Sequence, residues 1–535
     1  MNLLQSIKNL KNLWNEGVQA MRGTNSKYQP TKTQRLGSIT EHPKIAVSDA
    51  EYRRIKANLK YYRSEFDDVN YLDSNGTWSK RAFNHLPIGR TAAKKLASLV
   101  YNEKATVSLA DKKANAFIQE VLNDDRFHKN FERYLESGLA LGGLAMRPYV
   151  DGDKIRVAFV QAPVFFPLQS NTQDVSEAAI VTRTTKANGQ RNTYYTLIEF
   201  HEWKRTETGE PLYVITNELY TSQSADAVGE RVALSELYPD LDEVVEVKDL
   251  TRPLFTYLKT PGMNNRDINS PLGLSIFDNA KSTIDFINTT YDEYQWEVKM
   301  GQRRVIVPEN MTRTQLVQDD KGNLTTRQRF DPGHNVFVPI GVGGLDGQQI
   351  TDVTTPIRAS EYIATINQGL KIFELLLGVS SGMFTFDGEA VKTATEVVSE
   401  NSDTYQTRQS IATLVEQAHK ELVVSIFELA VGYDLYSGPI PTVDDVTVDL
   451  DDGVFQDRQS EFTYWAGLYA AGGCSQLTFI MKTRGLTRDQ AVQELKEING
   501  ELPPMTDAEL AIYNSQGQKK DENDDEEAPD GAVDE

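Results

Sequence analysis

The segment closest to a catalytic motif is Gly378-Val379-Ser380-Ser381-Gly382, which matches the pattern G-x-S-x-G. In hydrolases this pattern places a nucleophilic serine on a sharp turn between a strand and a helix. Here a stretch with helical periodicity precedes the serine, so the strand that such a turn needs is not expected. A serine hydrolase using Ser380 is therefore the weakest of the functional hypotheses.

Metal and nucleotide chemistry have less support still. The six histidines occur singly, at His42, His85, His128, His201, His334 and His419. None belongs to an HExxH motif, no GxxxxGK[ST] motif occurs, and the single cysteine, Cys474, rules out a cysteine-based zinc site. Asp449–Gly453 resembles the start of a calcium loop but lacks the later ligands. We expect no cofactor, no metal site and no catalytic residues.

The composition indicates a large acidic protein with a real core. The chain has 535 residues, 39% of them hydrophobic, and a net charge of −21. This length predicts two to four structural units, and this charge argues against a basic clamp for nucleic acid. Neither an unbroken apolar segment at the N-terminus nor a long uncharged apolar stretch occurs, so we expect no secretory signal and no contact with a membrane.

The two ends differ in charge from the rest. Residues 1–36 form a basic arm with helical apolar spacing, which we expect to pack on a partner or a neighbouring subunit; a helix on a membrane surface is the alternative. Residues 515–535 form an acidic tail without aromatic residues or periodicity, which predicts disorder. Because residues 507–535 carry −9 of the charge, the rest of the chain is still acidic, at −12.

The first 270 residues predict an α+β unit. Residues 48–150 have mainly helical patterns, clearest over 90–100 and 126–145. Residues 154–245 contain short β-branched and aromatic runs separated by turn signals, which predict an antiparallel meander.

Two matched helices are expected to enclose a small β element. Ser270-Pro271 is a plausible start for a helix ending near Met300, and Thr355-Pro356 a plausible start for the second. Two β runs lie between them. The second helix carries an apolar seam at helical spacing, made of Ile363, Ile366, Leu370, Phe373 and Leu377. We expect this seam to pack against the first helix and against neighbouring copies.

A glycine-bounded loop follows the second helix. Thr393-Ala394-Thr395-Glu396 is a capping box that opens a long helix reaching about Val431. A β run at 443–449 then leads to helical segments over 456–514, interrupted at Gly472-Gly473 and Gly485.

This order of elements resembles the portal proteins of tailed bacteriophages, in the siphophage branch of Gram-positive hosts. The most specific similarity lies in 378–408, above all at Lys392-Thr393-Ala394-Thr395-Glu396-Val397. Ser270-Pro271-Leu272-Gly273, opening a helix that ends in a β run, supports it.

The resemblance implies a portal fold with an α/β wing, a two-helix stem, a small β-containing clip, a long wing helix and a helical crown. It assigns the wing to 37–269 and 394–455, the stem to 270–300 and 356–379, the clip to 301–355, the tunnel loop to 380–393 and the crown to 456–514.

The resemblance also implies a function. Portal proteins form a ring, normally of twelve subunits, at one capsid vertex, through which double-stranded DNA is packaged and ejected. The terminase large subunit docks on the clip, and head-completion or adaptor proteins later replace it. Major capsid and scaffolding proteins are further partners, in the virion and, during assembly, in the host cytoplasm. The portal itself is not an enzyme.

Two groups of residues are candidates for these contacts. The local positive charge near the clip is expected to dock an acidic partner or lie near the DNA entry; ion pairing between subunits is the alternative. It comprises Lys299, Arg303, Arg304, Arg313, Arg327 and Arg329. In the tunnel loop, Met383, Phe384, Phe386 and Lys392 are expected to face the DNA channel; packing of the aromatic residues into the wing is the alternative. Another structural protein of the phage head, such as a minor capsid protein, remains a second hypothesis for the whole chain.

Overall fold

The computed structural model describes most of the chain between residues 35 and 498. The continuous described ranges are 35–301, 356–384, 402–450 and 458–484, with gaps at 73–76, 103–104, 171–173 and 190. Four strands between 305 and 352 are described by their backbone alone. The chain divides into two units, residues 1–451 and 452–535.

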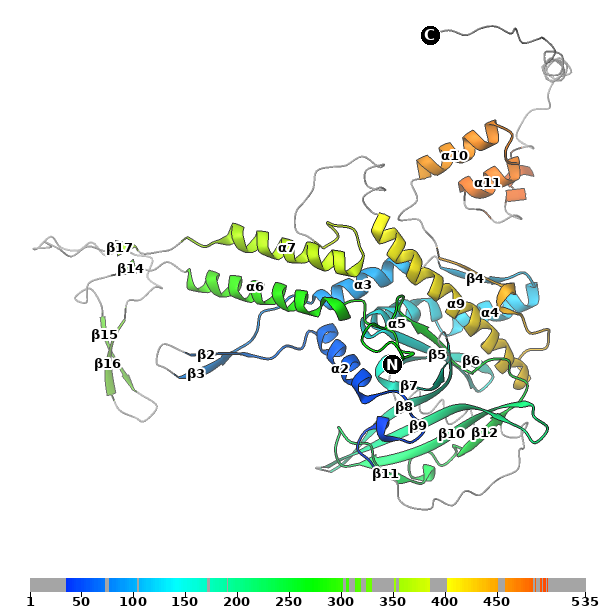
Figure 1. Ribbon diagram of the computed structural model, residues 1–535, viewed down its shortest axis with the longest axis horizontal. Helices are drawn as coiled ribbons and strands as arrows, with labels where there is room; N and C mark the ends of the chain where they lie inside the picture. The colour runs from blue at the N-terminus through cyan, green and yellow to red at the C-terminus, as the bar shows by residue number, and fades with distance from the viewer. Residues whose placement is uncertain are drawn as a thin grey trace, which may run out of the picture. The chain divides into compact units, whose positions relative to one another are not determined.

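Helices form one part of the first unit (Figure 1). They are α2 (Asp49–Arg63), α3 (Ile88–Val100), α4 (Lys112–Asp124), α5 (Phe127–Leu141) and α9 (Ser402–Gly432). Asp111 begins α4 by accepting a hydrogen bond from Ala114 N at 2.7 Å, as an N-cap residue does. Gly142 ends α5 with φ of 96°, and a Cβ there would lie 2.4 Å from Gly273 O, so the turn requires glycine.

A seven-stranded antiparallel sheet forms the other part. Its strands are β1 (Arg35–Leu36), β7 (Phe165–Ser170), β8 (Val175–Asn188), β9 (Arg191–Arg205), β10 (Pro211–Ser222), β11 (Gly229–Val232) and β12 (Val244–Val247). The order is β1-β11-β10-β9-β8-β7, and β12 also pairs with β10. Because β7 to β11 follow one another in sequence and in space, the predicted meander is confirmed from Phe165 onward. Its first predicted run, 155–160, lies in a separate three-stranded sheet.

Smaller sheets connect distant parts of the chain. They are β13-β5-β6, with β13 (Thr256–Lys259), β5 (Gly143–Asp151) and β6 (Lys154–Gln161), and the pair β4 (Thr106–Leu109) with β18 (Val446–Asp449). A hairpin of β2 (Val69–Leu72) and β3 (Trp78–Arg81) forms another. Short 3-10 turns lie at Ile39–Glu41, Ala162–Val164, Leu234–Glu236, Asp278–Ala280 and Val443–Asp445.

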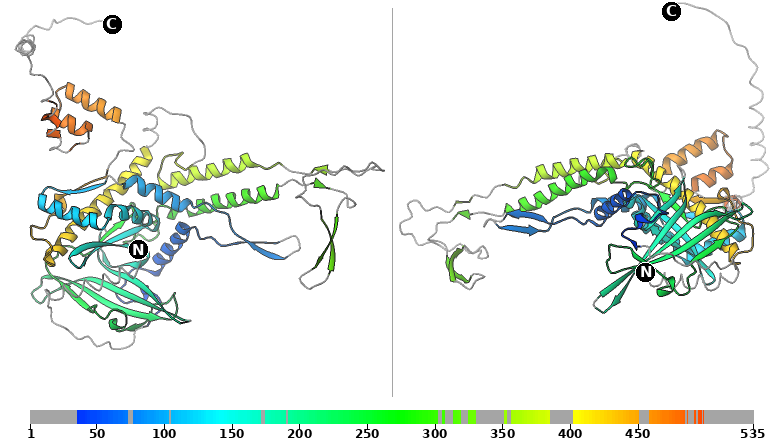
Figure 2. Two further views of the ribbon diagram at one scale, coloured as in Figure 1. Left: turned by 180° about the vertical axis from the view of Figure 1, so that it is seen from behind. Right: turned by 60° about the horizontal axis from the view of Figure 1, so that its bottom comes forward.

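Two long helices extend from this body, α6 (Lys281–Met300) and α7 (Ala359–Leu377) (Figures 1 and 2). Between them in sequence lie β14 (Val305–Ile306), β15 (Arg313–Gln318), β16 (Leu324–Arg329) and β17 (Thr351–Asp352). β14 pairs with β17, and β15 pairs with β16, both antiparallel. The predicted helix, β element and helix are thus all present, as is the α+β composition of the chain.

The second unit is helical where it is described. α10 (Arg458–Ala470) and α11 (Gln476–Arg484) are joined by a turn in which Gly472 has φ of 71°. Phe479 of α11 contacts both Phe462 and Tyr469 of α10, with ring centroids 5.9 Å and 5.2 Å apart. The predicted break at Gly472-Gly473 is therefore confirmed.

Several predicted boundaries were wrong. The first long helix begins at Lys281 rather than Ser270. The Ser270 hydroxyl donates to Glu51 Oε2 at 2.8 Å and accepts from Leu272 N at 3.3 Å, in a loop that precedes the helix. The second begins at Ala359, after Arg358, rather than at Thr355-Pro356. The helix expected over 126–145 ends at Leu141, since β5 starts at Gly143. The capping box at Thr393–Glu396, the basic arm up to residue 34 and the acidic tail lie outside the described residues.

Candidate functional site: the helix pair and its attachments

The helix pair α6/α7 is held together by one apolar seam. Ile284 and Ile287 of α6 are buried, as are Ile366, Leu370, Phe373 and Leu377 of α7. Of the five seam residues expected from the sequence, only Ile363 is not buried, being 45% exposed. Gly369 lets the two helices approach closely, because a Cβ at this position would lie 2.7 Å from Cγ1 of Ile287.

A second contact joins the helices at the end away from the body. Arg358 donates to Glu297 through its backbone N at 2.9 Å and through its guanidinium at 3.2 Å and 2.6 Å. These hydrogen bonds lower the pKa of Glu297 to about 2. Tyr294 and Tyr362 stack beside them with ring centroids 5.3 Å apart. Together these contacts join the last turns of α6 to the start of α7.

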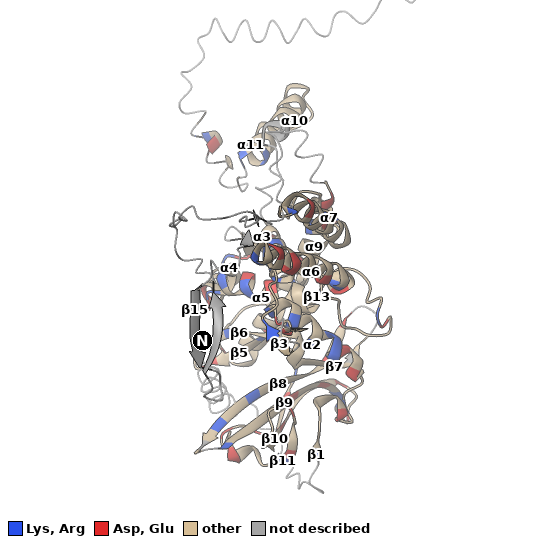
Figure 3. Ribbon diagram, turned by 90° about the vertical axis from the view of Figure 1, so that its left-hand side faces the viewer, with Lys and Arg blue, Asp and Glu red and all other residues tan. Residues whose placement is uncertain are grey.

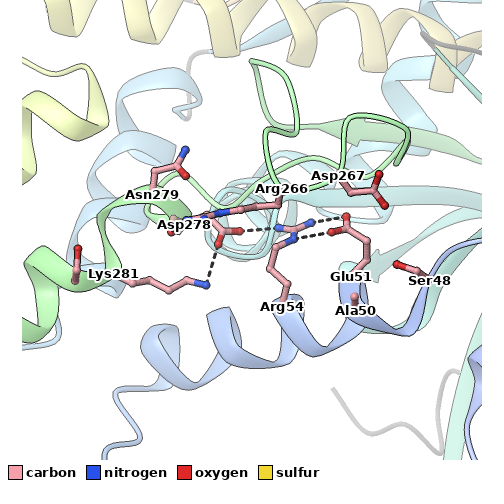
Figure 4. Close-up of a pocket in the computed structure, with 10 residues that line it drawn as sticks. Ser48, Ala50, Glu51, Arg54, Arg266, Asp267, Asp278, Asn279 and Lys281 are labelled. Atoms are coloured by element: carbon pink, nitrogen blue, oxygen red, sulfur yellow. Dashed lines mark hydrogen bonds and ion pairs between the residues drawn. The ribbon is translucent and has the colours of Figure 1, made fainter.

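A buried ion cluster attaches the start of α6 to α2 (Figure 4). The Arg54 guanidinium lies between Glu51 and Asp278, at 2.9 Å and 2.6 Å, and Lys281 lies 2.8 Å from Asp278. Burial alone would raise the pKa of Asp278, but hydrogen bonds from Lys281, Asn58 and Arg54 outweigh it and hold the pKa below its usual value. The cluster lines an open pocket of about 520 Å³. Because its charges pair with one another, we assign it to positioning α6 rather than to ligand binding.

The β2/β3 hairpin is attached to the other end of α6. The Arg81 guanidinium makes two hydrogen bonds of 2.6 Å to Asp292 and lies 4.8 Å from the Trp296 ring centroid. Asn84 N also donates to Asp292, at 3.0 Å. Tyr71 contacts Trp296 as well, at 5.8 Å between ring centroids. Sequence reasoning missed this hairpin, although Asn75-Gly76 between two short β runs is a strong hairpin signal.

The turn after α7 is fixed by polar contacts. Gly378 ends the helix with φ of 70°, and the buried Glu374 accepts hydrogen bonds from the backbone of Gly382 and Phe384. Ser380 and Thr404 interlock, because each backbone N donates to the other's hydroxyl, at 2.8 Å and 3.3 Å. The turn is therefore tied both to α7 and to the first turn of α9.

These contacts do not support a nucleophilic serine at position 380. The Ser380 side chain is buried, and its hydroxyl accepts a hydrogen bond from Thr404 N. Each of the five histidines in the described part of the chain has its hydrogen bond elsewhere, with Glu218, Phe83, Tyr101, Tyr213 and Val415. Ser380 also follows a helix rather than a strand.

Two of the four predicted tunnel-loop residues lie within the described residues. Met383 and Phe384 are half-buried and pack against the main core. The Lys95 ammonium of α3 donates to Met383 O at 2.5 Å and lies 5.1 Å from the Phe384 ring centroid. Phe384 also contacts Phe373 edge to face. These contacts favour the alternative of packing into the body; Phe386 and Lys392 lie outside the described residues.

The predicted docking residues are only partly described. Lys299 is exposed at the end of α6, whereas Arg303 and Arg304 lie outside the described residues. The backbone register of β15 and β16 pairs Arg313 with Arg329 and Gln315 with Arg327. Three of the arginines thus occupy alternate register positions in one two-stranded sheet.

Several apolar side chains of the helix pair are exposed in the described part of the chain. On α6 and α7 the exposed large apolar residues are Phe286, Val298, Met300, Ile363, Ile372, Leu375 and Leu376. Leu375 is the most exposed of them, at 76%. The pair therefore presents apolar surface beyond its own seam.

The described residues hold no cluster of histidine, cysteine, aspartate or glutamate able to bind a metal ion. Within the same residues, no helix combines the length and the apolar character needed to span a membrane.

Comparison with known proteins gives one match. The sequence model of the family described as phage portal protein, SPP1 Gp6-like, matches residues 41–502, which is most of the chain. A search of curated proteins finds no match.

Proposed function

Because the chain belongs to the SPP1 Gp6-like family of phage portal proteins, we propose that it forms a closed ring at one vertex of a capsid, through which double-stranded DNA is packaged and ejected. The ring has about twelve subunits, as the resemblance implies. In this assembly α6 and α7 form the stem, the β element between them forms the clip, and the remainder of the first unit forms the wing.

The exposed apolar surface of α6 and α7 carries this proposal. A soluble chain that leaves Phe286, Leu375 and Leu376 open to water gains stability when another copy covers them. Cyclic symmetry gives every copy the same pair of neighbours, so a ring covers this surface in all copies at once.

The charge of the chain fits a conduit for DNA. A duplex that must slide cannot be held by many Lys or Arg contacts to phosphate. Residues 1–506 carry −12 per copy, so the ring repels the duplex on balance. We assign the positively charged residues near the clip to docking the terminase large subunit and, later, head-completion or adaptor proteins.

The tunnel loop keeps its proposed role in a shortened form. Since Glu374 and Lys95 hold residues 382–384 against the body, we assign the contact with DNA to the residues after Phe384. Phe386→Asp is then expected to leave ring formation intact and to impair packaging or retention of DNA. Phe384→Asp, as the matched change, should lower the thermal unfolding midpoint because it removes packing on Phe373. Equal effects of the two changes on stability would contradict the shortened loop.

Native mass spectrometry and negative-stain microscopy of the purified chain test the assembly. The expected result is a closed ring of about twelve copies. A folded monomer at micromolar concentration, judged by its circular dichroism spectrum, would overturn the proposal. An open or variable oligomer would favour the minor capsid protein.

A further inference from the structure

The β2/β3 hairpin has two faces of different character. Its register pairs Val69 with Arg81 and Tyr71 with Ser79, and these residues are half-buried. The alternate pairs, Asn70 with Lys80 and Leu72 with Trp78, are exposed. Because side chains alternate between the faces of a strand, the first set forms an inner face toward α6 and the second an outer face.

The outer face is exposed although the hairpin is firmly attached. Asp292, which receives both hydrogen bonds from Arg81, is itself buried. Arg81 and Tyr71 also lie against Trp296. On the outer face Trp78 is 74% exposed and Leu72 57% exposed, side by side. An exposed large aromatic side chain, on a hairpin that other contacts fix in place, is typical of an anchor residue in a protein interface.

The hairpin and α7 lie on opposite sides of α6. The hairpin contacts α6 at Asp292 and Trp296, whereas α7 contacts it at Ile287, Tyr294 and Glu297. At about 100° per residue, these two sets are roughly 160° apart around the helix axis. Both views in Figure 2 show the same order of hairpin, α6 and α7. Each copy therefore has two unlike edges, which head-to-tail assembly into a ring requires.

The first turns of α7 lie at the same level as the hairpin. Tyr362 stacks on Tyr294 and Arg358 binds Glu297, next to Trp296 in sequence. On the side of α7 away from α6, Glu361 and Ala364 are exposed at this level. Glu361 carries the charge opposite to that of Lys80, which lies between Arg81 at Asp292 and Ser79, the strand partner of Tyr71 at Trp296. Figure 3 shows this contrast, with blue on β3 and red on α6 and α7.

We propose that the outer face of the β2/β3 hairpin docks on the outer end of α7 of the neighbouring copy, with Lys80 beside Glu361 and Trp78 farther out, against the start of α7. This inference rests on the proposed ring and names the contact that closes it at the outer end of the stem. Rotation about a ring axis keeps every residue at its own height, so surfaces at one level along the stem meet.

A cross-linking experiment tests the contact directly. The chain carrying Cys474→Ser, Lys80→Cys and Glu361→Cys should form, on mild oxidation of the assembled protein, a ladder of covalent oligomers up to the full ring. Moving the second cysteine to the other end of α7, with Lys371→Cys in place of Glu361→Cys, should leave monomers on a denaturing gel. Intact rings that give no ladder with the first pair would overturn the inference.

Substitutions test how much the proposed contact stabilises the ring. Trp78→Ala should raise the protein concentration at which half of the chains are in rings by about tenfold or more, as expected for an aromatic anchor. Met263→Ala, equally exposed at 74% but outside both edges, should leave it unchanged. Lys80→Glu should weaken the ring, and Lys80→Glu with Glu361→Lys should restore it.

The outcomes separate this inference from the proposed function. If the unmodified chain forms no ring, the proposed function fails. If it forms rings that Trp78→Ala and Lys80→Glu leave equally stable, the ring stands and the hairpin contact is wrong.

Discussion

The seven-stranded sheet and the helix pair α6/α7 differ in which side chains they bury and which they leave exposed. In the sheet, the buried Glu199 pairs with Arg147 of β5, and the buried His201 hydrogen-bonds to Tyr213 at 3.0 Å. In the helix pair, one seam is buried while Phe286, Leu375 and other apolar residues face water. Within the described residues, the sheet thus places charged groups beside partners, whereas the helix pair leaves large apolar side chains exposed.

The largest expected contrast lies within α7 itself. Phe373 is fully buried in the seam, so Phe373→Ala should lower the free energy of unfolding of the dissociated chain by about 3–5 kcal/mol. Leu375 lies two residues away on the open side, and Leu375→Ala should change this free energy by no more than about 0.5 kcal/mol.

Urea denaturation below the concentration of ring formation measures the first effect. The ring-forming concentration should respond to Leu375→Ala, because the proposed ring covers this exposed side chain. A large loss of monomer stability in Leu375→Ala would show that α7 is covered within its own chain.

A second contrast compares the two attachments of α6. Asp278→Ala leaves Arg54 and Lys281 without their shared partner, and breaking a buried ion pair in this way should cost about 3 kcal/mol. Glu293→Ala, on the exposed surface of the same helix, is the matched control and should have little effect. The two variants are compared by their urea midpoints. Equal midpoints would mean that the cluster does not hold α6 on the body.

The third prediction concerns how the stability of the helical core around His419 depends on pH. His419 is buried among Tyr101, Phe127 and Phe131, and this burial lowers its pKa to about 4. The unfolded chain takes up the proton near the ordinary pKa of about 6.5, so lowering the pH from 7 to 5 favours unfolding. The expected loss from His419 is about 2 kcal/mol over this range.

His419→Phe should remove this part of the pH dependence, because phenylalanine suits the aromatic surroundings and does not titrate. Denaturation midpoints at pH 7 and pH 5 for both chains measure it. An unchanged slope in the variant would exclude His419 as its source.

The sequence predicted repeating patterns better than single contacts. The alternation of β8 to β10 and the seam of α7 are periodic, so the meander and four of the five seam residues emerged from the sequence. The start of α6 did not, since Ser270 has a distant partner, Glu51, which no local pattern reveals. Ile363 has the spacing of the seam, yet only the path of α6 decides that it is uncovered.

The hydrogen bonds that fix the turn after α7 could not be predicted from the sequence either. Glu374 reads as an ordinary helix residue, and its hydrogen bonds to Gly382 and Phe384 arise from the turn that Gly378 permits. The hairpin was missed for a different reason, because its strands are short and lie beside helical patterns. Its contacts to Asp292 and Trp296 join residues about two hundred positions apart, which periodicity cannot predict.

The smallest expected effect on stability comes from the charges near the clip. Arg303→Glu with Arg304→Glu should leave ring formation and the thermal midpoint unchanged, since surface charges contribute little to stability. Terminase binding should fall, because a surface that attracts an acidic partner would then repel it. Lys56→Glu with Lys60→Glu, an equal reversal on the exposed side of α2, is the matched control and should bind terminase normally. Binding is measured by pull-down with the purified rings at low and at high salt. If both variants bind equally well, the arginines serve only pairing between subunits, and the docking surface lies elsewhere on the ring.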